Sequence, residues 1–361
     1  MNIQYLDVIF STAFSLRKLK TIVLKQSRDY YMRPQMHILL VSPFGTTKSS
    51  ITKRLKQTYT DKDIWLIDDF TKASVEGSIG KDGDYVPPIV IHLGGKIMII
   101  DEWNNVDQYG QQALLSVLEN QSWKRSLGFK NKNPYVYTDS QGYGNISINQ
   151  NIIEGKMCFG CIAFAMEYPV YDNSQKAKAL LSRFSPLFFE PTKDFMELAT
   201  KGEFNINVDD YGNKITDVII PKPVYMRFHK EYYKYINKNN LYPDNTDDYG
   251  FISRIMSDII RIGVFNYMRY KGKKIRGNVL KIDNIRCFTD AFDYITTIRN
   301  NFLNPKTKGK IQMYKDLLQK HPDENKDYYA KVLGVSRQTI WEYDRKLKIS
   351  VSDFEAKDDE R

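Results

Sequence analysis

The sequence has few cysteines and no long apolar run, and these absences exclude several classes of protein. Three cysteines in 361 residues cannot form a disulfide framework, and Cys158 and Cys161 lack the second Cys or His pair of a zinc site. No apolar stretch reaches the roughly 18 residues of a membrane span, and residues 1–10 do not resemble a signal peptide. We therefore expect a protein of the reducing cytoplasm without a membrane partner.

Positive charge is plentiful and unevenly distributed. The chain holds 53 Lys and Arg against 43 Asp and Glu, a net charge of +10 that favours a polyanionic partner such as DNA. Residues 303–350 contain eleven bases and six acids, so half of the net charge lies in this segment. Residues 351–361 contain five acids and two bases, which predicts a disordered acidic tail.

Hydrophobic patterning predicts an α/β fold. The first 35 residues read as helix followed by a basic, tyrosine-rich connection. Three uniformly apolar runs, 37–41, 96–100 and 157–165, predict buried strands of a parallel sheet with helices between them. From about Tyr225 to Phe302 such runs are absent, which favours helices. The expected domains are an α/β core at 1–196, a linker and helical lid at 197–302, a linker at 303–310, a helix-turn-helix domain at 311–350 and the acidic tail at 351–361.

A phosphate-binding loop is predicted directly after the first strand. Such a loop needs small residues whose N–H groups face the phosphates, then a Lys for the β- and γ-phosphates and a hydroxyl for Mg²⁺. Gly45, Lys48 and Ser49 supply these parts, although Ser42 stands where the pattern has its first glycine. The predicted ATP-binding residues are Ser42, Pro43, Phe44, Gly45, Thr46, Thr47, Lys48, Ser49 and Ser50.

Two carboxylates follow the second strand, about fifty residues after the loop. Asp101 and Ser49 are predicted to hold Mg²⁺, and Glu102 to polarise the attacking water. Lys48, Asp101 and Glu102 are predicted to be catalytic. The alternative is a pair of solvated acids at a strand end.

Several segments resemble the MCM-type branch of AAA+ ATPases, which are replicative DNA helicases. The similar segments are Phe44–Ser49, Phe70–Val75, Ile91–Trp103, Gln112–Gln121 and Leu180–Phe184, in the family's order. The resemblance implies ATP and Mg²⁺ as cofactors and a homo-oligomer, expected to be a hexamer. It makes Arg183 the arginine finger that reaches ATP in the neighbouring subunit, and it places Arg254 near the phosphates as the sensor-two residue.

The chain departs from this family in three places. The oligonucleotide-binding and zinc region that precedes the ATPase core in cellular MCM helicases is not found. The sensor-one Asn is missing after Ala165, where Met166, Glu167 and Tyr168 follow. Residues 122–154 form an enlarged segment where the family has a DNA-contacting hairpin, so Lys124 and Arg125 are predicted to bind DNA, with a solvated charged hairpin as the alternative.

The C-terminal region predicts a helix-turn-helix, optionally winged. Residues 327–333 and 336–347 read as two helices joined by a glycine turn, with Ser336 as the N-cap. The predicted core is Ala330, Leu333, Val335, Ile340 and Leu347. The predicted DNA-binding residues are Arg337, Gln338, Thr339, Tyr343 and Lys346. A helical protein-docking module is the alternative.

These features predict an ATP-hydrolysing, ring-forming DNA translocase or helicase of MCM-like type, serving replication of a mobile element or virus. Two other functions fit the same residues. One is an ATP-dependent initiator or transcriptional regulator that remodels DNA without unwinding it. The other is a nucleotide-binding scaffold with weakened hydrolysis, which Ser42 and the missing sensor-one Asn would permit.

Overall fold

The computed structural model divides into two compact units, Met1–Leu303 and Asn304–Arg361. In the first unit the structure describes residues 3–42, 48–79, 85–120, 122–126, 135–138, 142–149, 152–165, 183–188, 193–201, 206–212, 214–239, 249–272 and 277–295. In the second unit it describes residues 314, 317–318, 322, 324–333 and 335–344. Within these ranges no helix has the length and apolarity that a membrane crossing requires.

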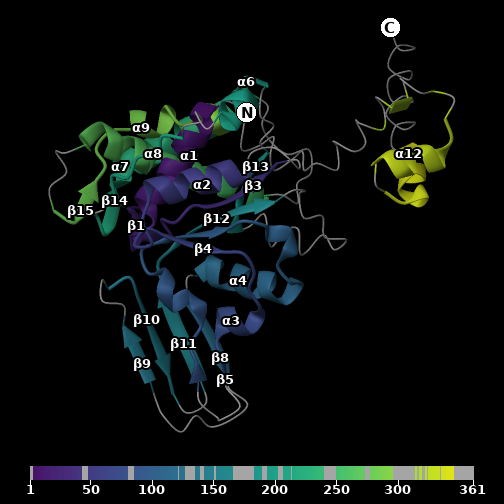
Figure 1. Cartoon of the computed structure of the whole chain (residues 1–361). Coiled ribbons are helices and arrows are strands. Elements are labelled where there is room, and N and C mark those ends of the chain that lie inside the picture. The colour runs from purple at the N-terminus through teal and green to yellow at the C-terminus, as the bar shows by residue number, and fades with distance from the viewer. Residues whose placement is uncertain are drawn as a thin grey trace. The chain divides into compact units, whose positions relative to one another are not determined.

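A five-stranded parallel sheet lies in the middle of the first unit (Figure 1). In chain order its strands are β3 (His37–Val41), β4 (Ile64–Ile67), β7 (Ile97–Ile100), β12 (Gly160–Ala165) and β13 (Ser185–Phe188). Side by side they run β13, β3, β12, β7 and β4, and every neighbouring pair is parallel. The predicted strand runs 37–41 and 96–100 thus become inner strands. The expectation of an α/β fold is confirmed.

Helices and a second layer cover both faces of this sheet. Ile38 and Leu40 of β3 pack on one face with α1 (Ile3–Leu16), α2 (Lys48–Thr58) and α6 (Lys193–Thr200). Leu39 and Val41 pack on the other face with α4 (Gln108–Asn120) and residues of the segment 144–157. Because alternate strand residues face opposite sides and both sides are buried, the strand runs are uniformly apolar.

Short elements join β4 to β7 and β7 to α4. They are α3 (Lys72–Glu76), β5 (Ser78–Ile79), β6 (Tyr85–Val86), the 3-10 helix η1 (Ile89–Leu93) and the 3-10 helix η2 (Trp103–Asn105). Thr71 caps α3, because its hydroxyl accepts from the N–H of Ser74 at 3.3 Å and the Ser74 hydroxyl accepts from the N–H of Thr71 at 2.8 Å.

A second sheet is built from both ends of the unit. Its strands, in spatial order, are β15 (Val279–Lys281), β14 (Asp217–Ile220), β1 (Thr21–Leu24) and β2 (Tyr30–Met32). Helices α7 (Lys222–Lys238), α8 (Tyr249–Lys271) and α9 (Arg286–Thr289) share one apolar core with this sheet.

This sheet corrects two sequence-based expectations. Residues 21–24 and 30–32 are strands, so the prediction of helix before residue 35 is right only for α1. The described part of residues 197–302 includes the strands β14 and β15 besides helices, and β14 pairs with β1, so this region does not fold apart from the N-terminal segment. The apolar run of β1 is only four residues long, and periodicity cannot assign so short a run.

The enlarged segment forms a third, antiparallel sheet, which lies below the parallel sheet in Figure 1. Its strands, in spatial order, are β8 (Ser122–Ser126), β11 (Ile152–Met157), β10 (Gly144–Ile148) and β9 (Tyr135–Thr138). The predicted strand 157–165 is therefore two strands, because Met157 ends β11 and Gly160 begins β12.

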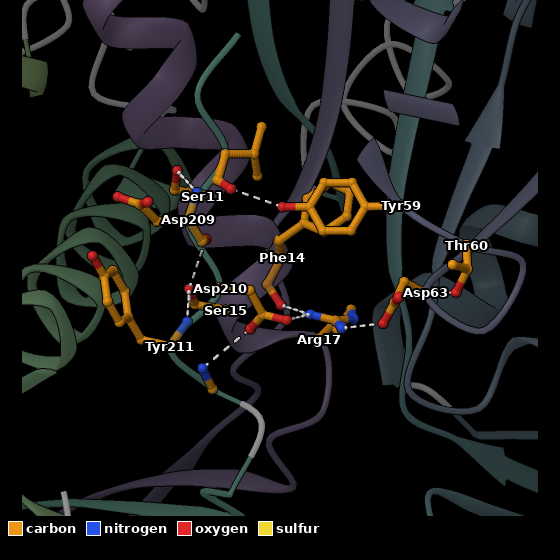
Figure 2. Close-up of polar contacts among 12 residues, drawn as sticks. Ser11, Phe14, Ser15, Arg17, Tyr59, Thr60, Asp63, Asp209, Asp210 and Tyr211 are labelled. Carbon is orange, nitrogen blue, oxygen red and sulfur yellow. Dashed lines mark hydrogen bonds and ion pairs between the residues drawn. The ribbon is translucent and has the colours of Figure 1, made fainter. Parts of the chain in front are cut away.

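Polar contacts fasten the segment 206–212 along α1 (Figure 2). The hydroxyls of Ser11 and Ser15, four residues apart on one helix face, accept the N–H groups of Asp209 at 2.9 Å and Tyr211 at 3.1 Å. Gly212 follows, and a Cβ there would meet the Ser15 carbonyl oxygen at 1.7 Å, so only glycine fits.

The buried guanidinium of Arg17 continues this network. It donates to Asp210 at 2.6 Å and to Asp63 at 2.8 Å, with 1% of its side chain exposed (Figure 2). The pair of carboxylates balances the desolvated charge and ties α1 to the start of β4.

The second unit contains α12 (Lys326–Leu333) and a second helical stretch at residues 337–344. Their small core consists of Tyr314, Tyr329, Leu333, Ile340 and Tyr343. Leu333 and Ile340 are predicted core residues, and Ala330 and Val335 are partly buried against them. Leu347 lies outside the described residues.

Candidate functional site

The predicted phosphate loop begins where β3 ends. Ser42 is fully buried, and its N–H donates to the carbonyl of Ala165 on the adjacent strand at 3.0 Å. The helix α2 begins at Lys48, and Ser50 on it is half-buried. The predicted binding residues Pro43, Phe44, Gly45, Thr46 and Thr47 lie outside the described residues, as do the side chains of Lys48 and Ser49.

Asp101 and Glu102 lie at the same edge of the sheet, directly after β7. The hydroxyl of Thr52, in the second turn of α2, donates to Asp101 Oδ1 at 3.0 Å. This bond brings the acid that follows β7 against the helix that follows the loop. Glu102 accepts a hydrogen bond from the side-chain amide of Asn105, and both acids are half-buried. Thr52 has the residue type and place to hold Asp101 but was not among the predicted site residues.

The donor set at this edge fits Mg²⁺ bound together with phosphates. Mg²⁺ keeps several waters and binds one or two carboxylates besides phosphate oxygens, so a single ordered Asp101 suffices on the protein side. No cluster of three or more His, Cys, Asp and Glu side chains suited to a metal ion occurs in the described part of the chain. The sensor-one candidates Met166, Glu167 and Tyr168 lie outside the described residues.

Arg183 lies at the opposite edge of the parallel sheet. It stands two residues before β13, in which Ser185 is paired with Ile38 at the amino end of β3. The length of β3, five residues or about 16 Å, separates that end from Ser42. Arg183 forms an ion pair with Glu119 near the end of α4, with side chains 17% and 50% exposed.

Arg254 lies on α8 near Arg183. Burial lowers the pKa of Arg254, Asp258 opposes this, and Arg261 and Arg183 lower the pKa further. The family resemblance places Arg254 near the phosphates, whereas the structure places it at the amino edge, away from the predicted phosphate loop of its own chain. The tertiary structure decides the position of Arg254. Asp258, one turn further along α8, accepts a hydrogen bond at 2.6 Å from Ser185, so this part of α8 packs at the amino edge of the sheet.

Three further charged residues at this edge, Glu119, Asp258 and Arg261, were not predicted from the sequence. Arg261 donates to Asp258 at 2.7 Å and to the carbonyl of Arg33 at 3.1 Å, and Glu119 pairs with Arg183. The spacing of Arg254, Asp258 and Arg261, at positions i, i+4 and i+7, is a signal that could have found part of this cluster, because it places the three on one helix face.

The candidate DNA-binding strand β8 is only partly described. Lys124 is exposed, and its ammonium lies 3.5 Å from Glu154, the residue opposite it on β11. The side chain of Arg125 lies outside the described residues. A groove of about 660 Å³ between α4 and the antiparallel sheet is lined by Lys124, Lys156 and Asn145, among others.

The second unit exposes some of its predicted DNA-binding residues and buries one. Arg337 and Gln338 are exposed, whereas Thr339 is half-buried and donates its N–H to the Ser336 cap at 3.1 Å. Tyr343 is 7% exposed, so the prediction that it faces DNA is wrong: its ring packs against Tyr314 in the core. Lys346 lies outside the described residues.

An aromatic side chain that was not predicted shares the exposed face of this helix. Trp341 is 58% exposed, and the ammonium of Lys326 lies over its ring, 3.4 Å from the centroid. Arg337 and Trp341 lie at positions i and i+4 of the helix, so the guanidinium and the indole ring lie on one helix face. Both groups suit contacts with a nucleic acid.

No protein-family model matches this sequence, and no curated protein matches it.

Proposed function

We propose that this chain is an ATP-hydrolysing, ring-forming DNA translocase or helicase of the MCM-like AAA+ type. The observation that carries the proposal is the contact of Thr52 with Asp101 at the carboxyl edge of the parallel sheet. Open α/β sheets bind ligands at this edge, where loops leave the strands. The strand order supports the same conclusion: numbered by position in the chain, the strands lie 5-1-4-3-2, as expected for an AAA+ core.

Each predicted residue at the carboxyl edge then has a role in ATP hydrolysis. Lys48 holds the β- and γ-phosphates, and Ser49 with Asp101 orders Mg²⁺ and its waters. Bound Mg²⁺ would neutralise charge that develops on the phosphates. Glu102 orients and polarises the attacking water.

Arg183 cannot serve the nucleotide of its own chain, because the length of the strands separates them. A subunit of a ring presents this edge to its neighbour, so Arg183 stabilises the transition state there. The hexamer remains part of the proposal.

Two surfaces would contact DNA. Lys124 and Arg125 in β8 are suited to phosphates and couple hydrolysis to movement. The second unit, through Arg337, Gln338 and Trp341, is suited to the choice of a binding site.

The experiment that tests this proposal is strand displacement on forked DNA. With ATP, the protein should release the labelled strand, and a nonhydrolysable analogue should not support release. ATP hydrolysis stimulated by DNA without displacement would instead favour a remodeller that does not unwind. ATP binding without turnover would favour the scaffold.

A further inference from the structure

The amino edge of the parallel sheet contains a buried guanidinium that the proposed function does not use. Arg33 lies four residues before β3, and its Nε and Nη1 atoms are enclosed without a hydrogen-bond partner among the described residues. Such groups are costly to bury, and most buried guanidinium atoms in proteins are paired. Arg33 therefore has two enclosed donor atoms, Nε and Nη1, without the hydrogen-bond acceptors that buried donors normally have.

The nearby acids are already engaged. Asp258 accepts Ser185 at 2.6 Å through one oxygen and Arg261 at 2.7 Å through the other. Glu119 is paired with Arg183. Glu119 still attracts Arg33 electrostatically, but neither carboxylate accepts a hydrogen bond from Nε or Nη1 of Arg33.

Positive charge consequently accumulates at this edge. Burial lowers the pKa of Arg33 most, the charges of Arg261 and Arg254 lower it further, and Glu119 opposes them only in part. With Arg183, four guanidinium groups share two carboxylates here. An anion that reached this cluster would relieve both the charge and the missing hydrogen bonds.

We propose that Arg33, together with Arg183, binds the terminal phosphates of an ATP molecule held by a neighbouring copy of this chain. The inference rests on the proposed function and adds to it a second phosphate-binding arginine. Glu119 occupies Arg183 in the free subunit and gives it up when the phosphates arrive.

The chemistry of the cluster favours a terminal phosphate. Its oxygens can accept from several guanidinium groups at once, and Arg is the side chain that binds phosphate in this bidentate way. A DNA phosphodiester carries one charge and needs an open groove. Arg33 is half-buried and Arg183 is 17% exposed, so the cluster opens only narrowly to solvent.

Replacing Arg33 by Gln tests this assignment. Arg33→Gln should lower kcat for ATP hydrolysis about tenfold to a hundredfold, with KM changed less than about threefold, because the contact forms mainly in the transition state. Arg28→Gln is the matched control, since Arg28 is exposed in the turn before β2, and it should hydrolyse ATP like the wild type.

A mixing experiment separates a role across the subunit boundary from a structural one. Arg33→Gln protein has an intact loop, and Lys48→Ala protein has an intact Arg33. In a one-to-one mixed ring, about a quarter of the interfaces are complete, so activity should recover to that order. Mixing Arg183→Ala with Lys48→Ala is the positive control, and capture through a tag on one variant verifies mixed oligomers.

The outcomes distinguish the inference from the proposed function. Recovery with Arg183→Ala but not with Arg33→Gln overturns the role of Arg33 alone. Unfolding of Arg33→Gln, seen as a lower urea midpoint than that of Arg28→Gln, also overturns it, because Arg33 would then hold the fold. Absence of ATP turnover in the wild-type protein overturns the proposed function itself.

Discussion

The two edges of the five-stranded parallel sheet differ in the charged residues that flank the strands. At the carboxyl edge, acids follow the strands: Asp68 and Asp69 come after β4, and Asp101 and Glu102 come after β7. At the amino edge, arginines precede the strands, with Arg33 before β3 and Arg183 before β13. The strands keep these groups about 16 Å apart.

Under the proposed function, this difference would make one subunit alone an incomplete ATPase. The groups suited to holding Mg²⁺ and activating water lie at one edge, and the groups suited to stabilising negative charge on phosphate lie at the other. A parallel sheet cannot fold back to join its own edges, so a second copy must supply the arginines under the proposed function.

The largest effect expected is at the carboxyl edge. Lys48→Ala should abolish ATP turnover, by about a thousandfold or more, because the phosphates lose their main cation. Glu102→Gln should leave ATP binding intact but stop hydrolysis, since it acts only on water. Release of phosphate and equilibrium binding of a fluorescent ATP analogue measure the two steps.

Lys53→Ala controls for this pair of variants. Lys53 is exposed on the same helix α2, so its loss removes equal charge without touching the loop. Wild-type turnover by Lys48→Ala or Glu102→Gln would break the assignment of the carboxyl edge.

The next largest effect concerns two buried arginines of the amino edge. Arg17 is paired with Asp63 and Asp210, so Arg17→Met should cost about 3–5 kcal/mol by stranding these acids. Arg33→Met should change the free energy of unfolding by less than about 1 kcal/mol, or raise it, because an unpaired charge leaves the interior. Urea unfolding measures both, and equal losses would contradict the division between a structural and a phosphate-binding arginine.

A pH effect should follow from the positive charge of the amino edge. His37 begins β3, and burial, followed by Arg33 and Arg261, lowers its pKa well below the usual 6.5. The unfolded state therefore takes up the proton first, so stability is full above pH 6.5 and falls as the pH drops below it. The free energy of unfolding should therefore decrease between pH 6.5 and pH 5.

Urea unfolding of the wild type and His37→Gln across this pH range isolates the effect. The variant should lose most of the pH-dependent difference below pH 6.5. A variant as acid-sensitive as the wild type would show that another group titrates.

The smallest effect should come from the residues proposed to bind DNA, in β8 and in the second unit. Truncation after Leu303 removes the second unit and should abolish preference among DNA sites while leaving DNA-stimulated ATP hydrolysis. Lys124→Ala combined with Arg125→Ala should do the reverse and flatten the log–log dependence of DNA affinity on salt, by about one unit for each phosphate that is no longer neutralised. Unchanged discrimination by the truncated chain would make the second unit a protein-docking module.

The local hydrophobic pattern alone predicted three of the five described strands of the parallel sheet, β3, β7 and β12. The runs at 37–41 and 96–100 are uniformly apolar because both faces of the sheet are covered, and this leaves a clear signal. The boundary between Met157 and Gly160 was missed, since Met157, Cys158 and Phe159 continue the apolar run into β12 without a polar residue that marks the change of sheet.

Residues whose environment depends on distant segments were less predictable. Tyr343 and Arg337 both lie on the second helix of the C-terminal unit, and only packing against Tyr314 decides that Tyr343 is buried. Likewise, β1 became a strand because β14, nearly two hundred residues later, pairs with it.

The sequence by itself determined the buried strands 37–41 and 96–100 and the acids that follow β7, because each depends on neighbours a few residues away. The tertiary structure alone decided that Thr52 meets Asp101, that Arg254 lies beside Arg183, and that Arg33 is buried without an acceptor for its Nε and Nη1 atoms among the described residues. These facts depend on strand order and on helices packed across the sheet. Contacts of that kind join residues tens to hundreds of positions apart, and no local pattern records them.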